Sequence, residues 1–167
     1  DNKGDVIIAA GDIYILNGNN NGSFGAGAFY SANGQTTSAI AIADFNNDNK
    51  PDVISLDNPN GGYKSLSIYT NTNYTGVAQA LTLPTAVSAN GAQSPGCIKA
   101  ADLDGDNKKD IVINDYDGNK LYVYKNNGNN TLTLLDSVIT AGKPLNIALA
   151  DINNDNRPDI ACSYYNT

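Results

Sequence analysis

The chain has 167 residues and a formal net charge of −7, which leaves no basic run to neutralise the phosphates of a nucleic acid. All of its 17 acidic residues are aspartates, histidine and glutamate are absent, and asparagine is abundant. These features exclude a nucleic-acid partner, favour a cationic one, and predict a single domain of strands and polar loops with almost no helix and no membrane span.

The N-terminal segment, 1–37, indicates only part of a repeat. It begins with DNKGDVII, in which Asp1 and Asp5 form the second half of an acidic loop that returns in full further along the chain. Three apolar runs, DVIIAA, DIYILN and GAFYSA, are bounded by Gly, Asn or Asp. Such runs are typical of short strands joined by hairpins. We therefore expect the chain to start inside a repeat.

The next segment, 38–94, contains the first complete acidic loop, ADFNNDNKPD, between two runs of buried-strand character. The runs SAIAIADF and DVISLD flank the loop, and SLSIYTN and QALTLP follow it. Alternation of Ala and Ile in the first run suits a strand in a crowded position, where backbones approach each other closely. The segment predicts four strands.

Oxygen donors at alternate positions of loop 44–52 predict a site for a hard cation. Ca²⁺ takes about six to eight oxygen ligands, often including a backbone carbonyl, at distances of about 2.3–2.6 Å. We expect the carbonyl to come from the lysine at the seventh position, with its charged side chain directed away. The predicted ligands are Asp44, Asn46, Asp48, Lys50 and Asp52.

Segment 95–143 repeats the pattern with the runs GCIKAADL, DIVIND, KLYVYKN and LTLLDSV. Its loop, 102–110, carries one more carboxylate than the other two complete loops, so we expect it to bind Ca²⁺ most tightly. The seventh residue again offers its carbonyl. The predicted ligands are Asp102, Asp104, Asp106, Lys108 and Asp110.

The C-terminal segment, 144–167, contains the runs LNIALADI and DIACSYYNT around loop 151–159. We expect the chain to end inside this repeat, as it starts inside the first. The seventh residue of the loop is again expected to contribute its carbonyl. The predicted ligands are Asp151, Asn153, Asp155, Arg157 and Asp159.

The sixth position of the three complete loops is an asparagine, namely Asn49, Asn107 and Asn156. Asparagine tolerates the left-handed backbone conformation that a tight turn demands. An EF-hand places Gly at this position and a bidentate Glu at the twelfth, which here lies inside a strand. The loops are therefore predicted to be calcium loops between strands and not EF-hands.

An alternative interpretation of the loops is a set of Asx-turns, which hydrogen-bond their own backbone and need no ion. Three or four carboxylates within one loop repel each other, however, and raise each other's pKa unless a cation lies between them. The electrostatic argument favours the metal site.

Acidic loops that recur roughly every fifty residues predict a repeat architecture. A four-stranded antiparallel unit of this period is typical of a β-propeller blade. The predicted fold is all-β, with a partial blade at 1–37, blades at 38–94 and 95–143, and a partial blade at 144–167. A ring needs about four to eight blades, so we expect either a piece of a longer protein or completion by neighbouring chains.

The two cysteines, Cys97 and Cys162, are too few and too far apart for a disulfide framework or a zinc site. We expect two partly buried small residues, with a disulfide within or between chains as the alternative.

Three Asn-X-Ser/Thr sequons begin at Asn21, Asn73 and Asn129. All three fall near the predicted loop between the third and fourth strands of a blade. They are candidate glycosylation sites on the outer part of the molecule.

The acidic loops between apolar strands, together with NGSFGAGAF at 21–29, resemble the FG-GAP and VCBS-type repeat family. Similar repeats form the propeller of integrin α-subunits and occur in bacterial secreted proteins and a fungal lectin. The resemblance implies structural calcium that stabilises each inner hairpin. It also implies that the functional residues lie in the loops and on the faces of the ring.

Catalysis is not expected, because the usual proton shuttles are absent and no base is apparent beside a Ser or Cys nucleophile. We predict a calcium-stabilised extracellular or cell-surface module that binds a protein or glycan ligand in adhesion, with Tyr164 and Tyr165 as candidate contact residues. The alternative is a structural protomer of an extracellular fibre or surface assembly, in which open blade edges pair with neighbouring chains.

Overall fold

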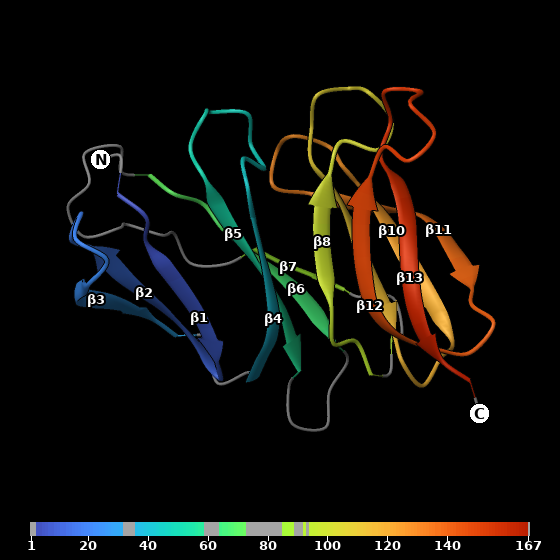
Figure 1. The fold of residues 1–167 in the computed structure, drawn as a ribbon, viewed down its shortest axis with the longest axis horizontal. Helices are drawn as coiled ribbons and strands as arrows, with labels where there is room; N and C mark the ends of the chain where they lie inside the picture. Colours follow the sequence, from blue (N-terminus) through green and yellow to red (C-terminus); the bar gives the residue numbers. More distant parts are fainter. Residues whose placement is uncertain are drawn as a thin grey trace.

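The computed structural model describes residues 3–31, 36–58, 64–72, 85–88, 92 and 94–166. In these ranges it contains strands and no helix, which confirms the all-β prediction (Figure 1). The strands of these ranges form four antiparallel sheets. No helix in the described part of the chain is long and apolar enough to cross a membrane.

Strands that are consecutive in the chain are neighbours in each sheet. The first sheet contains β1 (Val6–Ala10), β2 (Asp12–Gly18) and β3 (Phe24–Tyr30). The second contains β4 (Thr36–Ala43), β5 (Asp52–Asn58), β6 (Ser65–Tyr69) and β7 (Thr85–Ser88). The third contains β8 (Ile98–Ala101), β9 (Asp110–Asp115), β10 (Lys120–Asn126) and β11 (Leu132–Ile139). The fourth contains β12 (Lys143–Ala150) and β13 (Asp159–Tyr165).

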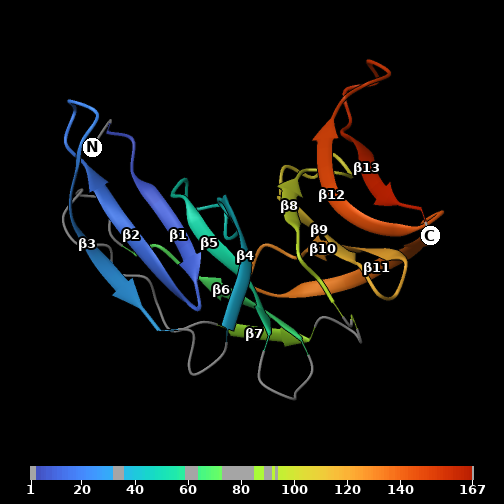
Figure 2. The ribbon, with the colours of Figure 1, turned by 60° about the horizontal axis from the view of Figure 1, so that its bottom comes forward.

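The second and third sheets are four-stranded meanders of the kind that form propeller blades. Among the described residues, the first sheet has no counterpart of β4 and β8, and the fourth has only the first two strands of a blade. The sheets follow one another around an arc in chain order (Figure 2). The structure therefore contains propeller-like blades that are incomplete at both ends, as predicted, while the borders between repeats stay predictions.

The first two strands of each complete hairpin share one register. The last alanine of the first strand pairs with the first aspartate of the second, in the pairs Ala43↔Asp52, Ala101↔Asp110 and Ala150↔Asp159. This shared register places the three acidic loops at the same end of their sheets, along the upper edge in Figure 1. Each loop is thus the connection of an inner hairpin.

The largest part of the core lies between the second and third sheets. Ile54 and Ile68 from one sheet and Ile111 and Tyr124 from the other are all at most 1% exposed and belong to one apolar cluster. The alanines of β4 pack against this cluster. Small side chains on the first strand therefore allow the neighbouring sheet to approach, as the Ala and Ile alternation predicts.

Candidate metal centres

Loop 102–110 joins β8 to β9 and turns around its own first carboxylate. Asp102 Oδ1 accepts a hydrogen bond from the Gly105 N–H at 2.7 Å, and Asp102 Oδ2 accepts one from the Asn107 N–H at 2.8 Å. The fifth residue, Asp106, accepts a hydrogen bond from the Lys108 N–H at 3.0 Å. The backbone N–H groups thus orient the carboxylates of the loop.

Two of these hydrogen bonds recur in the other two complete loops. The first carboxylate accepts from the N–H of the sixth residue at 2.8 Å in both, from Asn49 to Asp44 and from Asn156 to Asp151. The fifth-position aspartate accepts from the N–H of the seventh residue, at 3.0 Å in loop 44–52 and 2.8 Å in loop 151–159. Asx-turns are therefore present in all three loops, whether or not an ion also binds there.

Two positions of each loop have left-handed backbone conformation. The sixth-position asparagines have φ values of 63°, 64° and 66°, which confirms the prediction for Asn49, Asn107 and Asn156. The fourth position is left-handed as well, and there the chain carries Asn or Gly, the residues that adopt this conformation at least cost. Sequence reasoning missed the fourth position, although residue type was the available signal.

Three carboxylates of loop 102–110 converge on one point. Asp102, Asp104 and Asp106 each offer an oxygen atom, and these three atoms lie within 4.8 Å of one another. No other group of three acidic, thiol or imidazole ligands converges in the described part of the chain. Carboxylate oxygens are the ligands that hard cations such as Ca²⁺ prefer. The donor set of this loop therefore fits the predicted metal.

Two lysine ammonium groups lie against these carboxylates. The Lys125 ammonium contacts the Asp104 carboxylate and lies 2.8 Å from Asp106 Oδ2, and the Lys108 Nζ atom lies 3.0 Å from the same oxygen. Lys125 first, and then Lys108, hold the pKa of Asp106 well below its usual range. The Asp104 and Asp106 carboxylates in turn raise the pKa of Lys125. The site is thus acidic but already partly neutralised.

The position of these lysines differs from the sequence expectation. The Lys108 side chain turns towards the carboxylates and not away from them, and the Lys50 ammonium likewise lies 3.4 Å from an Asp48 oxygen. The clustered negative charge attracts the nearest ammonium groups. Sequence reasoning missed Lys125 entirely, because it lies on β10 and nothing in the loop motif indicates which strand passes beside it.

The ninth-position aspartates make backbone contacts instead of joining the converging carboxylates. Asp110 is 0% exposed; its Oδ2 atom accepts from the Leu103 N–H at 3.1 Å and its Oδ1 atom from the Asn126 N–H at 2.9 Å. Asp52 makes the equivalent pair of bonds at 3.0 Å and 2.8 Å. Burial raises the pKa of both carboxyl groups. Asp159 repeats the first of these bonds with the Ile152 N–H at 2.9 Å.

Loops 44–52 and 151–159 have an amide where loop 102–110 has its middle carboxylate. Asn46 Oδ1 accepts from the Asp48 N–H at 3.0 Å, and the Asn153 side-chain amide donates to Asp155 Oδ2 at 3.1 Å. These amides add oxygen donors without adding charge. Their role as ligands stays a prediction, as do the ninth-position carboxylates and the carbonyls at the seventh position of all three loops.

The predicted residues outside the acidic loops lie in two different settings. Asn21 and Asn129 are exposed in the turns after β2 and β10, the expected places, and Asn73 lies outside the described residues. Cys97 and Cys162 are half-buried free thiols beside one apolar cluster. Burial, and then the neighbouring Cys97, raise the pKa of Cys162. The expectation of partly buried thiols therefore holds, and use of the sequons stays a prediction.

Comparison with known families agrees with the repeat that the geometry defines. A family model described as an FG-GAP-like repeat matches residues 1–55, 44–113 and 102–162. Each match begins at an acidic loop, or at the half loop of the N-terminus, and ends in the strand that follows the next loop. No curated protein matches the chain.

Proposed function

Because the chain belongs to the FG-GAP-like repeat family, we propose that it is a calcium-stabilised β-propeller-type module that acts outside the cell by binding a protein or glycan ligand. The observation that carries the proposal is the convergence of Asp102, Asp104 and Asp106 in loop 102–110. The other two loops have the same hydrogen-bonded turn but one carboxylate fewer, so they are weaker sites of the same kind. Calcium is the structural cofactor in this proposal.

The charges around the site support a divalent ion. The singly charged ammonium groups of Lys125 and Lys108 balance the carboxylates of Asp104 and Asp106. The two lysine side chains are 30% and 28% exposed. Such side chains can swing into solvent, because exposed ion pairs contribute little to stability. Ca²⁺ carries twice the charge of an ammonium and accepts more oxygen ligands. We therefore expect Ca²⁺ to displace the Lys125 ammonium.

Unfolding temperature tests the calcium proposal. An ion that binds only the folded chain stabilises it by about 2.7 kcal/mol when its concentration is about 100 times Kd. We expect millimolar Ca²⁺ to raise Tm relative to chelator, and Mg²⁺ to raise it less. A double variant, Asp104→Asn with Asp106→Asn, should lose most of the shift, whereas Asp136→Asn, which removes an exposed carboxylate of β11, should keep it.

The outcome that counts against the calcium proposal is specific. A Tm that is equal in Ca²⁺ and in chelator, or a shift that the double variant retains in full, would leave the loops as Asx-turns without an ion. The Asp136→Asn control separates loss of the site from loss of an exposed carboxylate elsewhere.

The ligand-binding part of the proposal concerns exposed aromatic side chains on the last strand. Tyr164 and Tyr165 of β13 are 48% and 58% exposed, and tyrosine offers amphipathic contact area at low conformational cost. We propose a contact surface at this end of the fourth sheet, and no catalytic role for it. Glycan-array or protein-array binding that is unchanged in Tyr164→Ala and Tyr165→Ala chains would remove these residues from the surface.

A second candidate function is assembly into an extracellular fibre or surface layer. It is favoured by the open strand edges at β1 and β13 in the described structure and by the exposure of Ile152, which is 66% exposed in loop 151–159. Open edges pair readily with further strands. We expect concentration-dependent association in sedimentation velocity, and a chain that stays monomeric at high concentration would remove this candidate.

A further inference from the structure

The two cysteines of the chain lie at the interface between the third and fourth sheets. Cys97 directly precedes β8 of the third sheet, and Cys162 lies in β13 of the fourth. Both are half-buried free thiols packed against one apolar cluster, which contains Val112 of the third sheet and Ile147 of the fourth. The sequence contains no other cysteine and no methionine, so the sulfur chemistry of this chain is confined to this interface.

The Cys97 side chain faces the fourth sheet. Cys97 extends the pairing of β8 with β9, because its carbonyl accepts from the Asn114 N–H at 3.2 Å. The next residue, Ile98, belongs to the apolar cluster between the second and third sheets, and successive side chains of a strand point to opposite faces. The Cys97 thiol donates to Asn146 Oδ1 of β12 at 3.2 Å. The sulfur atom therefore lies against the fourth sheet.

The Cys162 side chain faces the third sheet. Cys162 lies directly opposite Ile147 in the pairing of β13 with β12, and residues opposite each other in an antiparallel pair share one face. Ile147 is 3% exposed and belongs to the same cluster as Val112 of β9. Burial, and then the neighbouring Cys97 thiol, raise the pKa of Cys162. The two thiols thus approach each other from opposite sides of the interface.

The preceding interface has apolar residues at the same two strand positions. Cys97 lies four residues before the alanine that ends its register with an aspartate, as Ala39 does in β4. Cys162 lies three residues after the paired aspartate, as Ile113 does in β9. Ala39 and Ile113 belong to one apolar cluster between the second and third sheets. These two positions therefore face a shared interface in both pairs of sheets.

Hydrogen bonds fix the backbone on both sides of the thiols. Asn114 is 2% exposed; its Oδ1 atom accepts from the Cys97 N–H at 2.7 Å, and its side-chain amide donates to the Pro144 carbonyl of β12 at 2.9 Å. Strand β12 is in turn paired with β13, which carries Cys162. Two groups held in one folded chain react at a high effective concentration, which favours a bond between them over a bond to a small molecule.

We propose that Cys97 and Cys162 form a disulfide that joins the third sheet to the fourth. The oxidant is a small-molecule disulfide such as oxidised glutathione. One protein thiolate attacks this disulfide and releases one small thiol, and the other protein thiolate then attacks the protein sulfur of the mixed disulfide and releases the second. The two protein thiols lose two electrons and two protons in total, and the small disulfide takes them up as two thiols.

The cross-link would stabilise the fourth sheet, in which most side chains are exposed. A disulfide that closes a long loop restricts the unfolded chain and so favours the folded one. The bond replaces two weak thiol hydrogen bonds, from Cys97 to Asn146 and from Cys162 to the Ser163 carbonyl. The cross-link depends neither on bound calcium nor on the proposed ligand.

Oxidation of the full chain tests the proposal. The reduced chain is incubated in chelator with oxidised glutathione at about pH 8, close to the ordinary thiol pKa of about 8.5. Free thiols are then counted in denaturant, and a digest is analysed by mass spectrometry without reduction. We expect both thiols to disappear without bound glutathione, and a linked pair of peptides that contains Cys97 and Cys162. Tm in chelator should rise by about 5–10 °C, and reduction should reverse the rise.

A displaced thiol provides the matched control. The double variant Cys162→Ser with Ser163→Cys keeps two thiols but moves one to the next position of β13, whose side chain points to the other face. We expect this variant to end as mixed disulfides with glutathione. Cys97→Ser should bind one glutathione and lose the oxidation-dependent rise in Tm. Circular dichroism and Tm of the reduced proteins confirm that each variant folds.

Three outcomes overturn the proposal. The first is a folded, unmodified chain that keeps its two thiols or carries only glutathione adducts. The second is cross-linking that joins only separate chains on a non-reducing denaturing gel. The third is an internal disulfide in the displaced-thiol variant as abundant as in the unmodified chain. Because every step is carried out in chelator and without a ligand, failure of the calcium site or of the contact surface does not alter the result.

Discussion

At the scale of single residues, the aspartates of each acidic loop have two separate tasks. The Asp106 carboxylate is partly exposed, meets two ammonium groups and has a lowered pKa. The Asp110 carboxylate, four residues on, is 0% exposed, accepts two backbone N–H groups and has a pKa raised by burial. The Asp106 carboxylate is thus accessible to a cation, and the Asp110 carboxylate joins the loop to the neighbouring strand.

Replacing Lys125 by Gln should strengthen calcium binding. The Lys125 ammonium contacts Asp104 and Asp106, so Ca²⁺ must displace it, and removing one nearby charge changes the interaction by about 1 kcal/mol in water. We expect Kd for Ca²⁺ to fall about fivefold in isothermal titration calorimetry. Lys99→Gln, the same change at an exposed site on β8, should leave Kd within about twofold. Unchanged affinity in Lys125→Gln would mean that the ammonium does not compete with the ion.

Replacing Asp110 by Asn should destabilise the chain by about 1–3 kcal/mol at neutral pH. An amide has one oxygen, so it accepts from either the Leu103 or the Asn126 N–H and turns its own NH₂ group towards the other. Urea unfolding in chelator measures the loss, and Asp136→Asn serves as the exposed control. A variant as stable as the control would show that the two backbone bonds contribute little.

The pH dependence of that loss has a defined sign. A folded-state pKa raised above the ordinary 3.8 contributes stability that is fully present below 3.8 and is lost as pH rises through the folded-state value. The difference in unfolding free energy between the unmodified chain and Asp110→Asn should therefore widen as pH falls from 7 towards 3.8. A difference that narrows on acidification would mean that the two N–H groups outweigh burial and hold the carboxyl pKa low.

At the scale of elements, the inner hairpin connects one sheet to the next. Its register brings the acidic loop to the end of the sheet, and the second residue of the loop then packs against the following sheet, as Phe45 does. The Asn126 amide of the third sheet bonds the Phe45 carbonyl at 2.9 Å. Loop conformation and blade packing are therefore coupled.

Two substitutions at equivalent loop positions test this coupling. Phe45→Ala should cost about 3–5 kcal/mol, because a 0% exposed aromatic side chain is removed from the core. Ile152→Ala, at the same position of loop 151–159 but 66% exposed, should change stability by no more than about 0.5 kcal/mol. Urea unfolding of both variants provides the comparison. Equal costs would mean that the following sheet does not determine the contribution of this position.

At the scale of the whole molecule, the sheets form a row in which each contacts its neighbours (Figure 2). In such repeat architectures stability is approximately a sum of unit and interface contributions. The second and third sheets share the largest buried cluster, which includes Ile54, Ile68, Ile111 and Tyr124. The fourth sheet has two strands, and most of its side chains are exposed. We therefore expect the middle of the row to be its most stable part.

Amide hydrogen exchange should follow this gradient. Every residue of β9 and all but the last of β5 are buried, so their amides should exchange slowest, and those of β13 should exchange first through local opening. Mass spectrometry of exchange in chelator and in Ca²⁺ gives the order. Protection of β13 equal to that of β9 would contradict the gradient and indicate that another chain covers the fourth sheet.

The sequence by itself determined the repeat, the acidic loops, the inner hairpins and most of the strands. The run QALTLP, expected to form the fourth strand of the second sheet, lies outside the described residues, and the strand described there is β7, Thr85–Ser88. These features depend on local chemistry: alternating apolar residues form half-buried strands, and Asn and Gly supply left-handed turns at positions such as Asn107. The convergence of Asp102, Asp104 and Asp106 follows from the same spacing, because a tight turn directs alternate side chains inward. The turn and the convergence of these three carboxylates were therefore predictable, whereas the backbone contacts of Asp110, which the sequence placed among the ligands, were not.

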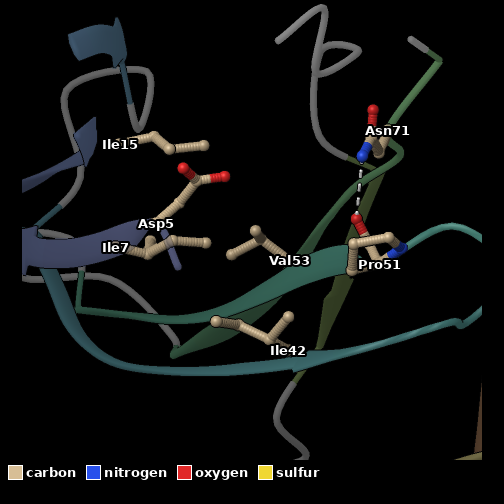
Figure 3. Close-up of a pocket in the computed structure, with 7 residues that line it drawn as sticks. All are labelled: Asp5, Ile7, Ile15, Ile42, Pro51, Val53 and Asn71. Carbon is tan, nitrogen blue, oxygen red and sulfur yellow. Dashed lines mark hydrogen bonds between the residues drawn. The ribbon is translucent and has the colours of Figure 1, made fainter. Parts of the chain in front are cut away.

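Only the tertiary structure decided which distant residues meet those loops. Lys125 reaches Asp104 and Asp106 from another strand, and the Asn126 amide bonds the carbonyl of a residue 81 positions earlier. The cavity lined by Asp5, Ile7 and Val53 likewise forms only where the first and second sheets pack together (Figure 3). Such contacts depend on the spacing and angle between packed sheets, and side-chain periodicity along a single strand carries no information about either.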